Sequence, residues 1–436
     1  MALSRIVFRL PALLAVAAVA IGAAAGGARA RDGIEYWEVQ DYGTVLAVRA
    51  DGFDTYQVTD ISCLPVVSDE AYVIVTASAT LRVDGSPGHR TLRRLSGLPP
   101  LCDTTVQPSV FDVFWQTFHE HYPFFDAKGM DWNAIRDIWR DRANDAQARG
   151  DDAALFAALR DTVEPLGDAH VMISAGTTGH FGSGRPGTVV PGPELDAKVK
   201  TFVQHRDLRD HPLTDYARGR ISYADLPDRP DYGYLRISGF GGYSDTDTFA
   251  ADSAALDHAL ADILTTDRRA RLRGLILDLR VNGGGSDSLG LRLAGWFTDR
   301  PYFAYAKKTR TTAPQPQRIT PSPNGFPVPI AILTGGSTVS AGETFTQAMI
   351  ERPARTVRIG EATQGVFSDV LERKLPGPGH GDWWFGLPNE LFLDGGGKTF
   401  DGTGIPPQLP EPVFTDEEFA RGADSAFDRA VRWLAE

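Results

Sequence analysis

One segment sets the architecture of this 436-residue chain: Pro329-Ile-Ala-Ile-Leu-Thr-Gly-Gly-Ser-Thr-Val-Ser340-Ala-Gly-Glu-Thr-Phe-Thr-Gln-Ala-Met349. The apolar, β-branched run at its start has the length of a buried strand. Gly335-Gly336 predicts a turn, and apolar residues after Ser340 recur with helical spacing. A strand, a glycine turn, a serine and a helix together place a hydroxyl group at the first turn of a helix.

Ser340 is therefore a candidate nucleophile. A helix start has unpaired N–H groups and a partial positive charge, so the N–H of Ala341 could stabilise an oxyanion beside it. The alternative is that Ser340 only caps the helix, which serines commonly do. This segment alone leaves both interpretations open.

A second informative segment, Arg280-Val-Asn-Gly-Gly-Gly285, follows the strongly apolar strand predicted at 274–279. A glycine run at the end of a strand lets the backbone approach a ligand, and its N–H groups can bind an anion. The segment lacks the endings of phosphate-binding and dinucleotide-binding loops. Beside Ser340 it could supply a second oxyanion donor.

A serine nucleophile needs a base, and the base needs an acid to orient it. Among nine histidines, His170 lies where a strand is predicted after a helical block, although a histidine there can also be structural. Asp401 lies on a tight turn, where an aspartate commonly has only a conformational role.

Residues 1–30 have the features of a secretory leader: two early arginines, an apolar run and an Ala28-Arg29-Ala30 cleavage site. The alternative is an uncleaved membrane anchor. We expect an exported, periplasmic or extracellular chain that begins near Arg31 and keeps no integral membrane segment. Removing the leader lowers the formal charge from −12 to −15, because it has three arginines and no acidic residue. This acidic balance argues against nucleic acid as a partner.

The mature chain has two cysteines, Cys63 and Cys102, which fit one disulfide in an oxidising compartment. Four regions follow the leader. Residues 31–105 are predicted as a small β domain that contains this disulfide, and 106–175 as a helical domain. Residues 176–231 are predicted as a loop-rich connection with short strands such as 198–204, and 232–436 as an alternating α/β core.

Four ordered motifs resemble those of the serine peptidases of family 41, which include the C-terminal processing (tail-specific) proteases, the tricorn core and the interphotoreceptor retinoid-binding protein repeats. The motifs are Asp278-Leu-Arg-Val-Asn-Gly-Gly-Gly285, Thr338-Val-Ser-Ala-Gly-Glu343, Gly360-Glu-Ala-Thr363 and Asp401-Gly-Thr-Gly-Ile-Pro-Pro407. The helical block that leads to Gly167-Asp-Ala-His170 resembles the tricorn-type branch. No recognisable PDZ module fits between His170 and Tyr232.

The resemblance implies an α/β fold with a crotonase/ClpP-like β-α superhelix core. It implies Ser340 as nucleophile, His170 as base and Asp401 as acid. It also implies an oxyanion hole formed by Ala341 and by Gly284 or Gly285. The supporting residues that it implies are Asn282, Glu343 and Glu361.

The chain departs from the family at three positions. Val366 stands where the processing proteases have their lysine base, so the base is predicted to be His170. Ala169 replaces the serine or glycine that precedes the histidine, and Asp401 replaces the usual glutamate.

The leading hypothesis is an exported serine peptidase that acts on peptides or proteins through an acyl-enzyme, with no metal and no cofactor. The alternatives are a non-catalytic ligand-binding or peptide-binding protein on the same scaffold and a hydrolase of small esters. The sequence indicates neither the natural substrate nor the oligomeric state.

Overall fold

The computed structural model describes residues 18–20, 33–67, 72–75, 78–104, 108–246, 248–377, 379–380 and 382–436. The chain divides into two compact units. The N-terminal unit comprises residues 1–84 and 89–107, and the second unit comprises 85–88 and 108–436. The predicted leader lies outside the described residues except for strand β1 (Ala18–Ala20).

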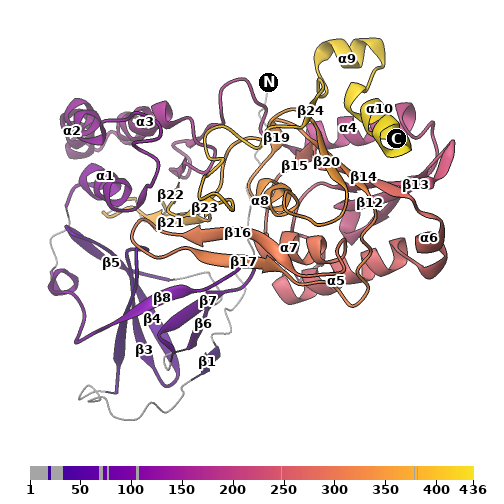
Figure 1. Cartoon of the computed structure of the whole chain (residues 1–436). Helices are drawn as coiled ribbons and strands as arrows, with labels where there is room; N and C mark the ends of the chain where they lie inside the picture. Colours follow the sequence, from indigo (N-terminus) through magenta and orange to yellow (C-terminus); the bar gives the residue numbers. More distant parts are fainter. Residues whose placement is uncertain are drawn as a thin grey trace. The chain divides into compact units, whose positions relative to one another are not determined.

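The N-terminal unit contains an eight-stranded sheet of order β1-β6-β7-β8-β2-β3-β4-β5 (Figure 1). Its other strands are β2 (Glu35–Val39), β3 (Thr44–Arg49), β4 (Gly52–Thr59), β5 (Ser62–Val66), β6 (Tyr72–Val75), β7 (Thr80–Val83) and β8 (Arg90–Leu95). Cys63 in β5 forms a disulfide with Cys102, which lies in a short 3-10 helix (Pro100–Asp103). The structure thus pairs the two cysteines as predicted.

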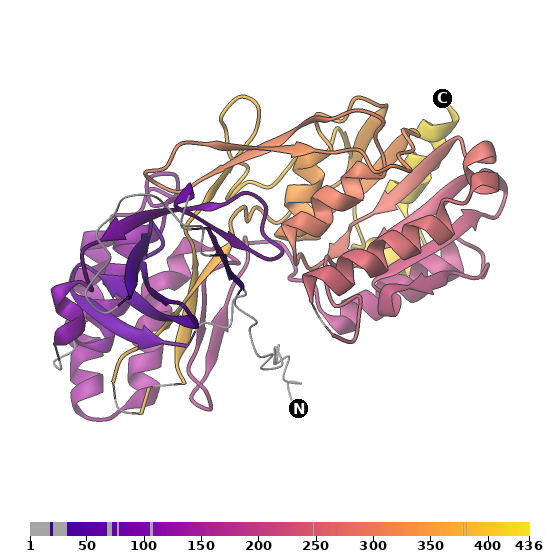
Figure 2. The ribbon, with the colours of Figure 1, turned by 90° about the horizontal axis from the view of Figure 1, so that it is seen from below.

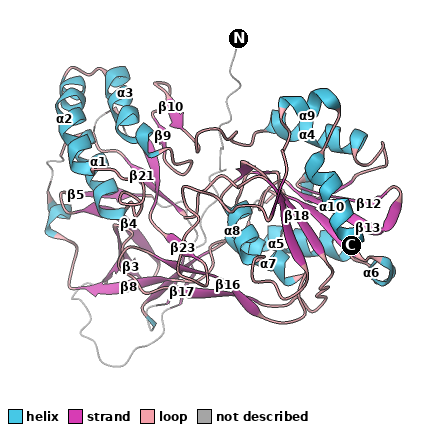
Figure 3. Cartoon of the chain, turned by 45° about the horizontal axis from the view of Figure 1, so that its top comes forward, coloured by secondary structure: helices cyan, strands magenta, loops and turns pink. Residues whose placement is uncertain are grey.

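The second unit begins with three helices, which Figure 3 shows grouped together: α1 (Val110–His121), α2 (Trp132–Ala148) and α3 (Asp152–Val163). Each is capped by a side chain that accepts a hydrogen bond from the first turn, namely that of Ser109, Asp131 or Asp151. Phe118 of α1 packs on Trp132 of α2, with ring centroids 5.4 Å apart. The helical block therefore has an aromatic core.

The centre of the second unit is a seven-stranded sheet of order β11-β12-β13-β14-β18-β20-β24. In this sheet, β13, β14, β18, β20 and β24 pair in parallel, whereas the pairs β11–β12 and β12–β13 are antiparallel. The strands are β11 (Thr214–Tyr216), β12 (Ile221–Leu226), β13 (Arg229–Ile237), β14 (Gly274–Asp278), β18 (Ile330–Thr334), β20 (Thr356–Gly360) and β24 (Leu409–Pro410).

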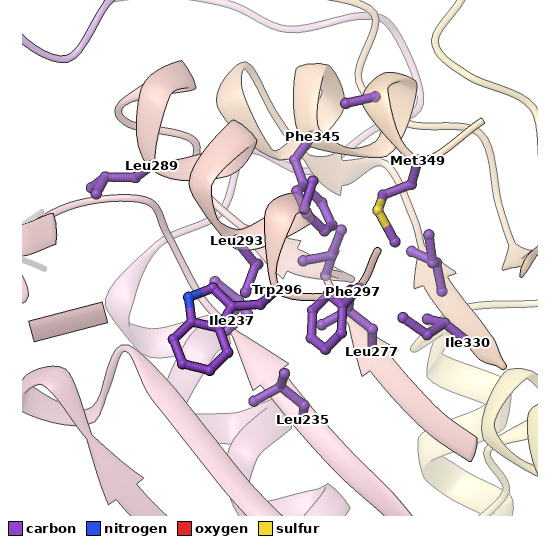
Figure 4. Packing of buried hydrophobic residues seen from close by; sticks show 14 of the residues in the cluster. Leu235, Ile237, Leu277, Leu289, Leu293, Trp296, Phe297, Ile330, Phe345 and Met349 are labelled. Atoms are coloured by element: carbon purple, nitrogen blue, oxygen red, sulfur yellow. The ribbon is translucent and has the colours of Figure 1, made fainter. Parts of the chain in front are cut away.

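Alternate residues of the buried strands supply two separate cores, because successive side chains of a strand point to opposite faces. Leu275 and Leu277 of β14 belong to one cluster, and Ile276 belongs to the other. The first cluster includes residues of α5, α7 and α8 and is drawn in Figure 4, while the second includes residues of α4 and α10. These helices are α4 (Pro193–Arg206), α5 (Phe249–Ile263), α7 (Asp287–Gly295), α8 (Ala341–Ala348) and α10 (Ser425–Ala435). The sheet is therefore covered on both faces, as an α/β fold requires.

Three smaller sheets complete the unit, with orders β10-β9-β22-β21, β17-β16-β23 and β15-β19. Figure 2 shows the long antiparallel pair β16 and β17. The strands of these three sheets are β9 (Met172–Ser174), β10 (His180–Gly182), β15 (Val281–Asn282), β16 (Tyr302–Lys308), β17 (Gln315–Ile319), β19 (Ser337–Thr338), β21 (Val370–Lys374), β22 (Trp384–Pro388) and β23 (Leu391–Leu393). Two short helices, α6 (Thr266–Arg271) and α9 (Asp416–Arg421), lie in connections.

The prediction for residues 176–231 is wrong in two respects. Residues 198–204, predicted as a strand, belong to helix α4, which begins at Pro193 and buries Val199 and Val203. Strands β11, β12 and the start of β13 also lie in this region, so the central sheet begins before residue 232. Proline at the first helical position and apolar residues four apart are the local signals of this helix. Within the described residues, no helix is long and apolar enough to cross a membrane.

Candidate active site

Ser340 occupies a strained turn between strand β19 and helix α8. Its φ is 54° and its ψ is −119°, an unusual conformation for a residue with a side chain. A sharp strand-to-helix turn exposes the hydroxyl of the serine nucleophile in α/β-hydrolases. Ser340 is half-buried, whereas every residue of α8 behind it is buried.

Glu343 holds the Ser340 turn through hydrogen bonds to backbone N–H groups. Its fully buried carboxylate accepts hydrogen bonds from the backbone N–H groups of Ser340 (3.0 Å), Gly365 (2.6 Å) and Val366 (3.0 Å). Burial raises the pKa of the Glu343 carboxyl to about 7, although these hydrogen bonds oppose the shift. Glu343 therefore connects the serine turn to the loop that follows β20.

The glycine loop lies directly against Ser340. A Cβ atom on Gly284, which has a φ of +84°, would lie 2.7 Å from the Cβ of Ser340. The buried amide of Asn282 accepts a hydrogen bond from the Gly284 N–H (3.0 Å) and donates one to the carbonyl of Ile237 (2.9 Å). A Cβ on Gly342 would also lie 2.6 Å from Asn282 Oδ1. Asn282 thus holds the loop against the first turn of α8.

This geometry favours one of the two predicted oxyanion donors over the other. The N–H of Gly284 already donates to Asn282, so it is occupied. Gly285 forms a bridge with Phe240, in which its neighbours Gly284 and Ser286 make the hydrogen bonds to Phe240. In the described part of the chain, the N–H groups of Gly285 and Ala341 donate to no recorded acceptor. These two remain the candidates.

His170 lies in the turn before β9 and is buried, with 6% of its surface exposed. Burial lowers the pKa of its imidazole, and the charges of Asp168 and Asp369 oppose this shift. Asp168 accepts a hydrogen bond from the His170 backbone N–H (3.0 Å). Among the described residues, the Nδ1 atom of His170 has no hydrogen-bond partner. Among the described residues, no hydrogen bond joins the His170 ring to Ser340.

The predicted contact between Asp401 and His170 is absent from the described residues. The Asp401 carboxylate instead accepts a hydrogen bond from the N–H of Phe367 (3.1 Å). Burial and the negative charge of Asp168 raise its pKa well above the usual range, which favours the neutral form. The shorter side chain of aspartate, compared with the glutamate usual at this position, is a physical reason for the missing contact.

The turn that carries Asp401 packs on the loop after β20. Gly404 is so close to Thr363 that a Cβ on it would lie 2.0 Å from the Thr363 carbonyl oxygen. The N–H of Gly402 donates to the carbonyl of Gly365 (2.8 Å). Glu361, predicted as a supporting residue, is exposed and accepts a hydrogen bond from the N–H of Val413 (3.2 Å), so it anchors the C-terminal segment.

Two groups of residues near the site have no counterpart in the sequence-based prediction. Asp168 is buried, accepts a hydrogen bond from the hydroxyl of Tyr122 (2.8 Å) and lies 3.9 Å from Lys128. The only sequence signal for a role of Asp168 is its position two residues before His170. The second group surrounds the buried Lys307, whose Nζ lies 3.0 Å from both Asp369 and Glu390. No spacing in the sequence connects these three residues, because they come from separate strands and loops.

Lys307 is a poor candidate for the base. The charges of Asp369 and Glu390 outweigh the effect of its burial and raise the pKa of its ammonium group above the ordinary value. It therefore holds its proton. No cluster of three or more potential metal-binding side chains occurs among the described residues.

Comparisons with known proteins indicate a family and a fold for this chain. Residues 231–410 match the model of peptidase family S41, and residues 107–159 match the tricorn protease C1 domain. No curated protein matches the sequence. A solved structure from Parabacteroides merdae ATCC 43184 is 20% identical, with a TM-score of 0.60 over 75% of this chain and 96% of that one. Mature CPAF complexed with lactacystin is 12% identical, with a TM-score of 0.51 over the same shares.

The two solved structures confirm the α/β fold, and the family match includes most of the central sheet, the glycine loop and the Ser340 turn. The match to the tricorn domain falls on the helical block. The predicted resemblance is therefore confirmed: residues 231–410 of this chain match peptidase family S41, which supports a serine-type peptidase.

Proposed function

We propose that the chain is an exported serine peptidase in which Ser340 is the nucleophile and His170 the general base. The observation that carries the proposal is the strained Ser340 turn, which faces a glycine loop and two N–H groups without a recorded acceptor, those of Gly285 and Ala341. Such donors stabilise the negative charge that develops on a carbonyl oxygen under attack.

In the proposed reaction, the imidazole of His170 takes the hydroxyl proton while Ser340 Oγ bonds to the substrate carbonyl carbon. The tetrahedral intermediate places its oxygen between the N–H groups of Gly285 and Ala341. The C–N bond then breaks, and the imidazolium gives its proton to the leaving amine. A water molecule, deprotonated by His170, cleaves the acyl-enzyme and restores the serine.

The lowered pKa of His170 favours the neutral imidazole that a general base requires. A general base must be neutral, and burial lowers the pKa of this imidazole. Asp168 holds the backbone of His170 and adds a negative charge nearby, so we assign it a positioning role. Asp401 is assigned to the support of the loop through Phe367. The contact between base and nucleophile is expected to form with substrate, since catalytic hydrogen bonds are often long in free enzymes.

The test is labelling with a fluorophosphonate, which reacts with an activated serine whatever the natural substrate. We expect one adduct, mapped to Ser340 by mass spectrometry, and none in Ser340→Ala or His170→Ala. Hydrolysis of a mixed peptide library should fall by about 10⁵-fold in either variant. Full activity in the Ser340→Ala variant would refute the mechanism.

Export is the second part of the proposal. It is supported by the leader-like residues 1–30 and by the disulfide between Cys63 and Cys102, because disulfides persist in oxidising compartments. N-terminal sequencing of the protein recovered from its native host should give a start near Arg31. A mature chain that still begins at Met1 and stays in the cytoplasm would contradict export.

One observation favours a second candidate function, a non-catalytic peptide-binding protein. Among the described residues, no hydrogen bond joins the His170 ring to Ser340 or Asp401, and the Nδ1 atom of that ring has no hydrogen-bond partner. A folded protein that binds peptides, resists the fluorophosphonate and hydrolyses no library member would support this candidate instead.

A further inference from the structure

A short segment, residues 183–191, crosses the three loops that surround Ser340; we call it the strap. At one end, the guanidinium of Arg185 donates to the carbonyls of Thr363 (2.7 Å) and Gln364 (3.0 Å) in the loop after β20. The strap is thereby attached to the same loop that Glu343 connects to the serine turn.

The middle of the strap lies on the turn that leads to Ser340. The hydroxyl of Ser337 in β19 donates to the carbonyl of Val189 (2.5 Å). A Cβ on Gly336 would lie 2.9 Å from Cγ2 of Thr188, so the strap packs tightly on this turn. At the other end, Pro191 lies 3.7 Å from the position of a Cβ on Gly283, in the glycine loop. The strap therefore borders the site along its length.

Val189 and Val190 are unusual in this position. Their exposed fractions are 62% and 56%, and among the described residues only two other large apolar side chains, Val67 and Ile138, are comparably exposed. An exposed apolar pair costs free energy in water unless something covers it. Two such residues in sequence, beside a nucleophile turn, point to a binding surface.

The backbone N–H groups of Val189 and Val190 are also available to bind a peptide. Within the described part of the chain, the N–H groups of Val189 and Val190 donate to no recorded acceptor. An extended peptide can bind such a backbone with its own carbonyl groups while its side chains enter neighbouring pockets. The strap thus offers both elements of peptide recognition.

We propose that the strap forms one wall of the substrate groove and that Val189 and Val190 select substrates with an aliphatic side chain near the cleaved bond. This inference rests on the proposed peptidase function of the Ser340 site. It assigns a substrate class, extended peptides with an aliphatic residue, and two specificity-determining residues.

The experiment compares kcat/KM for two quenched fluorescent peptides that differ only in leucine or serine at the preferred position, which a positional library identifies first. The wild-type enzyme should prefer leucine by about 10-fold or more, since filling an apolar pocket commonly gives such factors. The double variant Val189→Ser/Val190→Ser should lose this preference, so that its kcat/KM values for the leucine and serine peptides become similar.

A gain of function gives a second, independent readout. Val190→Lys should create a preference for an acidic residue at the same position, which a misfolded protein cannot produce. The matched control is Ile138→Ser, because Ile138 is 54% exposed and lies in helix α2; the leucine preference should persist there.

The outcomes separate the two proposals. If Ser340 takes the fluorophosphonate label but the leucine preference is absent, or survives in the double variant, the strap inference is refuted while the peptidase function stands. If no label forms on the folded wild-type protein, both proposals fail.

Discussion

At the scale of single residues, Gly284 is the position where an added side chain would collide with Ser340 itself. We expect Gly284→Ala to lower kcat by about 100-fold or more, the effect of losing an oxyanion donor, because the new methyl group would displace Ser340 or the Ala341 N–H. A φ of +84° adds backbone strain for any residue with a side chain. The measurement is steady-state hydrolysis of a library-derived peptide, with thermal unfolding to check the fold.

The control for this substitution is Gly182→Ala. Gly182 also lies in the second unit, but a Cβ there would meet no atom within 4 Å. Its activity should stay within about twofold of wild type. Equal losses in the two variants would show that the effect is not specific to the Ser340 contact.

His170 determines the expected pH dependence. Its pKa is lowered by burial, so the imidazole is neutral at neutral pH and becomes protonated only in acid. We therefore expect kcat/KM to fall as pH decreases through a midpoint below about 6.5, the unperturbed value. Asp168→Asn removes a negative charge that raises this pKa, so the midpoint should move to lower pH. A midpoint that stays in place or rises in this variant would contradict the assignment.

The sequence motifs name the candidate residues of the site but not all their contacts. The strand, the turn and the helix start around Ser340 follow from local patterns, since they are read within about ten residues. Our preference for Gly285 over Gly284 as the proposed oxyanion donor could not be predicted, because it depends on the amide of Asn282 and on a bridge to Phe240. The orientation of Asp401 depends likewise on a distant N–H, that of Phe367.

At the scale of elements, Glu343 joins helix α8 to the loop after β20. In Glu343→Gln, the amide NH₂ cannot accept, so at least one of three buried backbone N–H groups loses its acceptor. We expect a loss of about 1–3 kcal/mol in the free energy of unfolding, measured by urea denaturation, together with weaker fluorophosphonate labelling. Glu351→Gln, an exposed position just after α8, should change neither quantity. A stable, fully labelled Glu343→Gln protein would show that the connection is dispensable.

Helix α4 shows why some elements escaped prediction. Its N-terminal flank is rich in glycine and proline, and its charged residues mask a narrow apolar stripe of which only Val199 and Val203 are buried. Strands β14 and β18 are buried at every position and consist largely of apolar residues, because helices cover both faces of the sheet. Continuous apolar runs are strong signals, whereas a helix that buries two side chains is a weak one.

At the scale of the whole molecule, the chain combines a disulfide-containing unit with a unit that holds the site. The disulfide connects Cys63 and Cys102, 39 residues apart, and both lie in the N-terminal unit. Closing a loop of this length is expected to stabilise that unit by about 4 kcal/mol, mainly through the entropy of its unfolded chain. Dithiothreitol should therefore raise hydrogen exchange in peptides from strands β4 and β5, measured by mass spectrometry.

The double variant Cys63→Ser/Cys102→Ser separates this effect from others of the reductant. Its exchange in β4 and β5 should match that of the reduced wild type and should not respond to dithiothreitol. If alkylation shows both wild-type cysteines reduced while exchange in these strands stays unchanged, the bridge does not stabilise the unit. A stabilising bridge, by contrast, would make folding of the N-terminal unit depend on an oxidising compartment, which is the physical link between this disulfide and the proposed export.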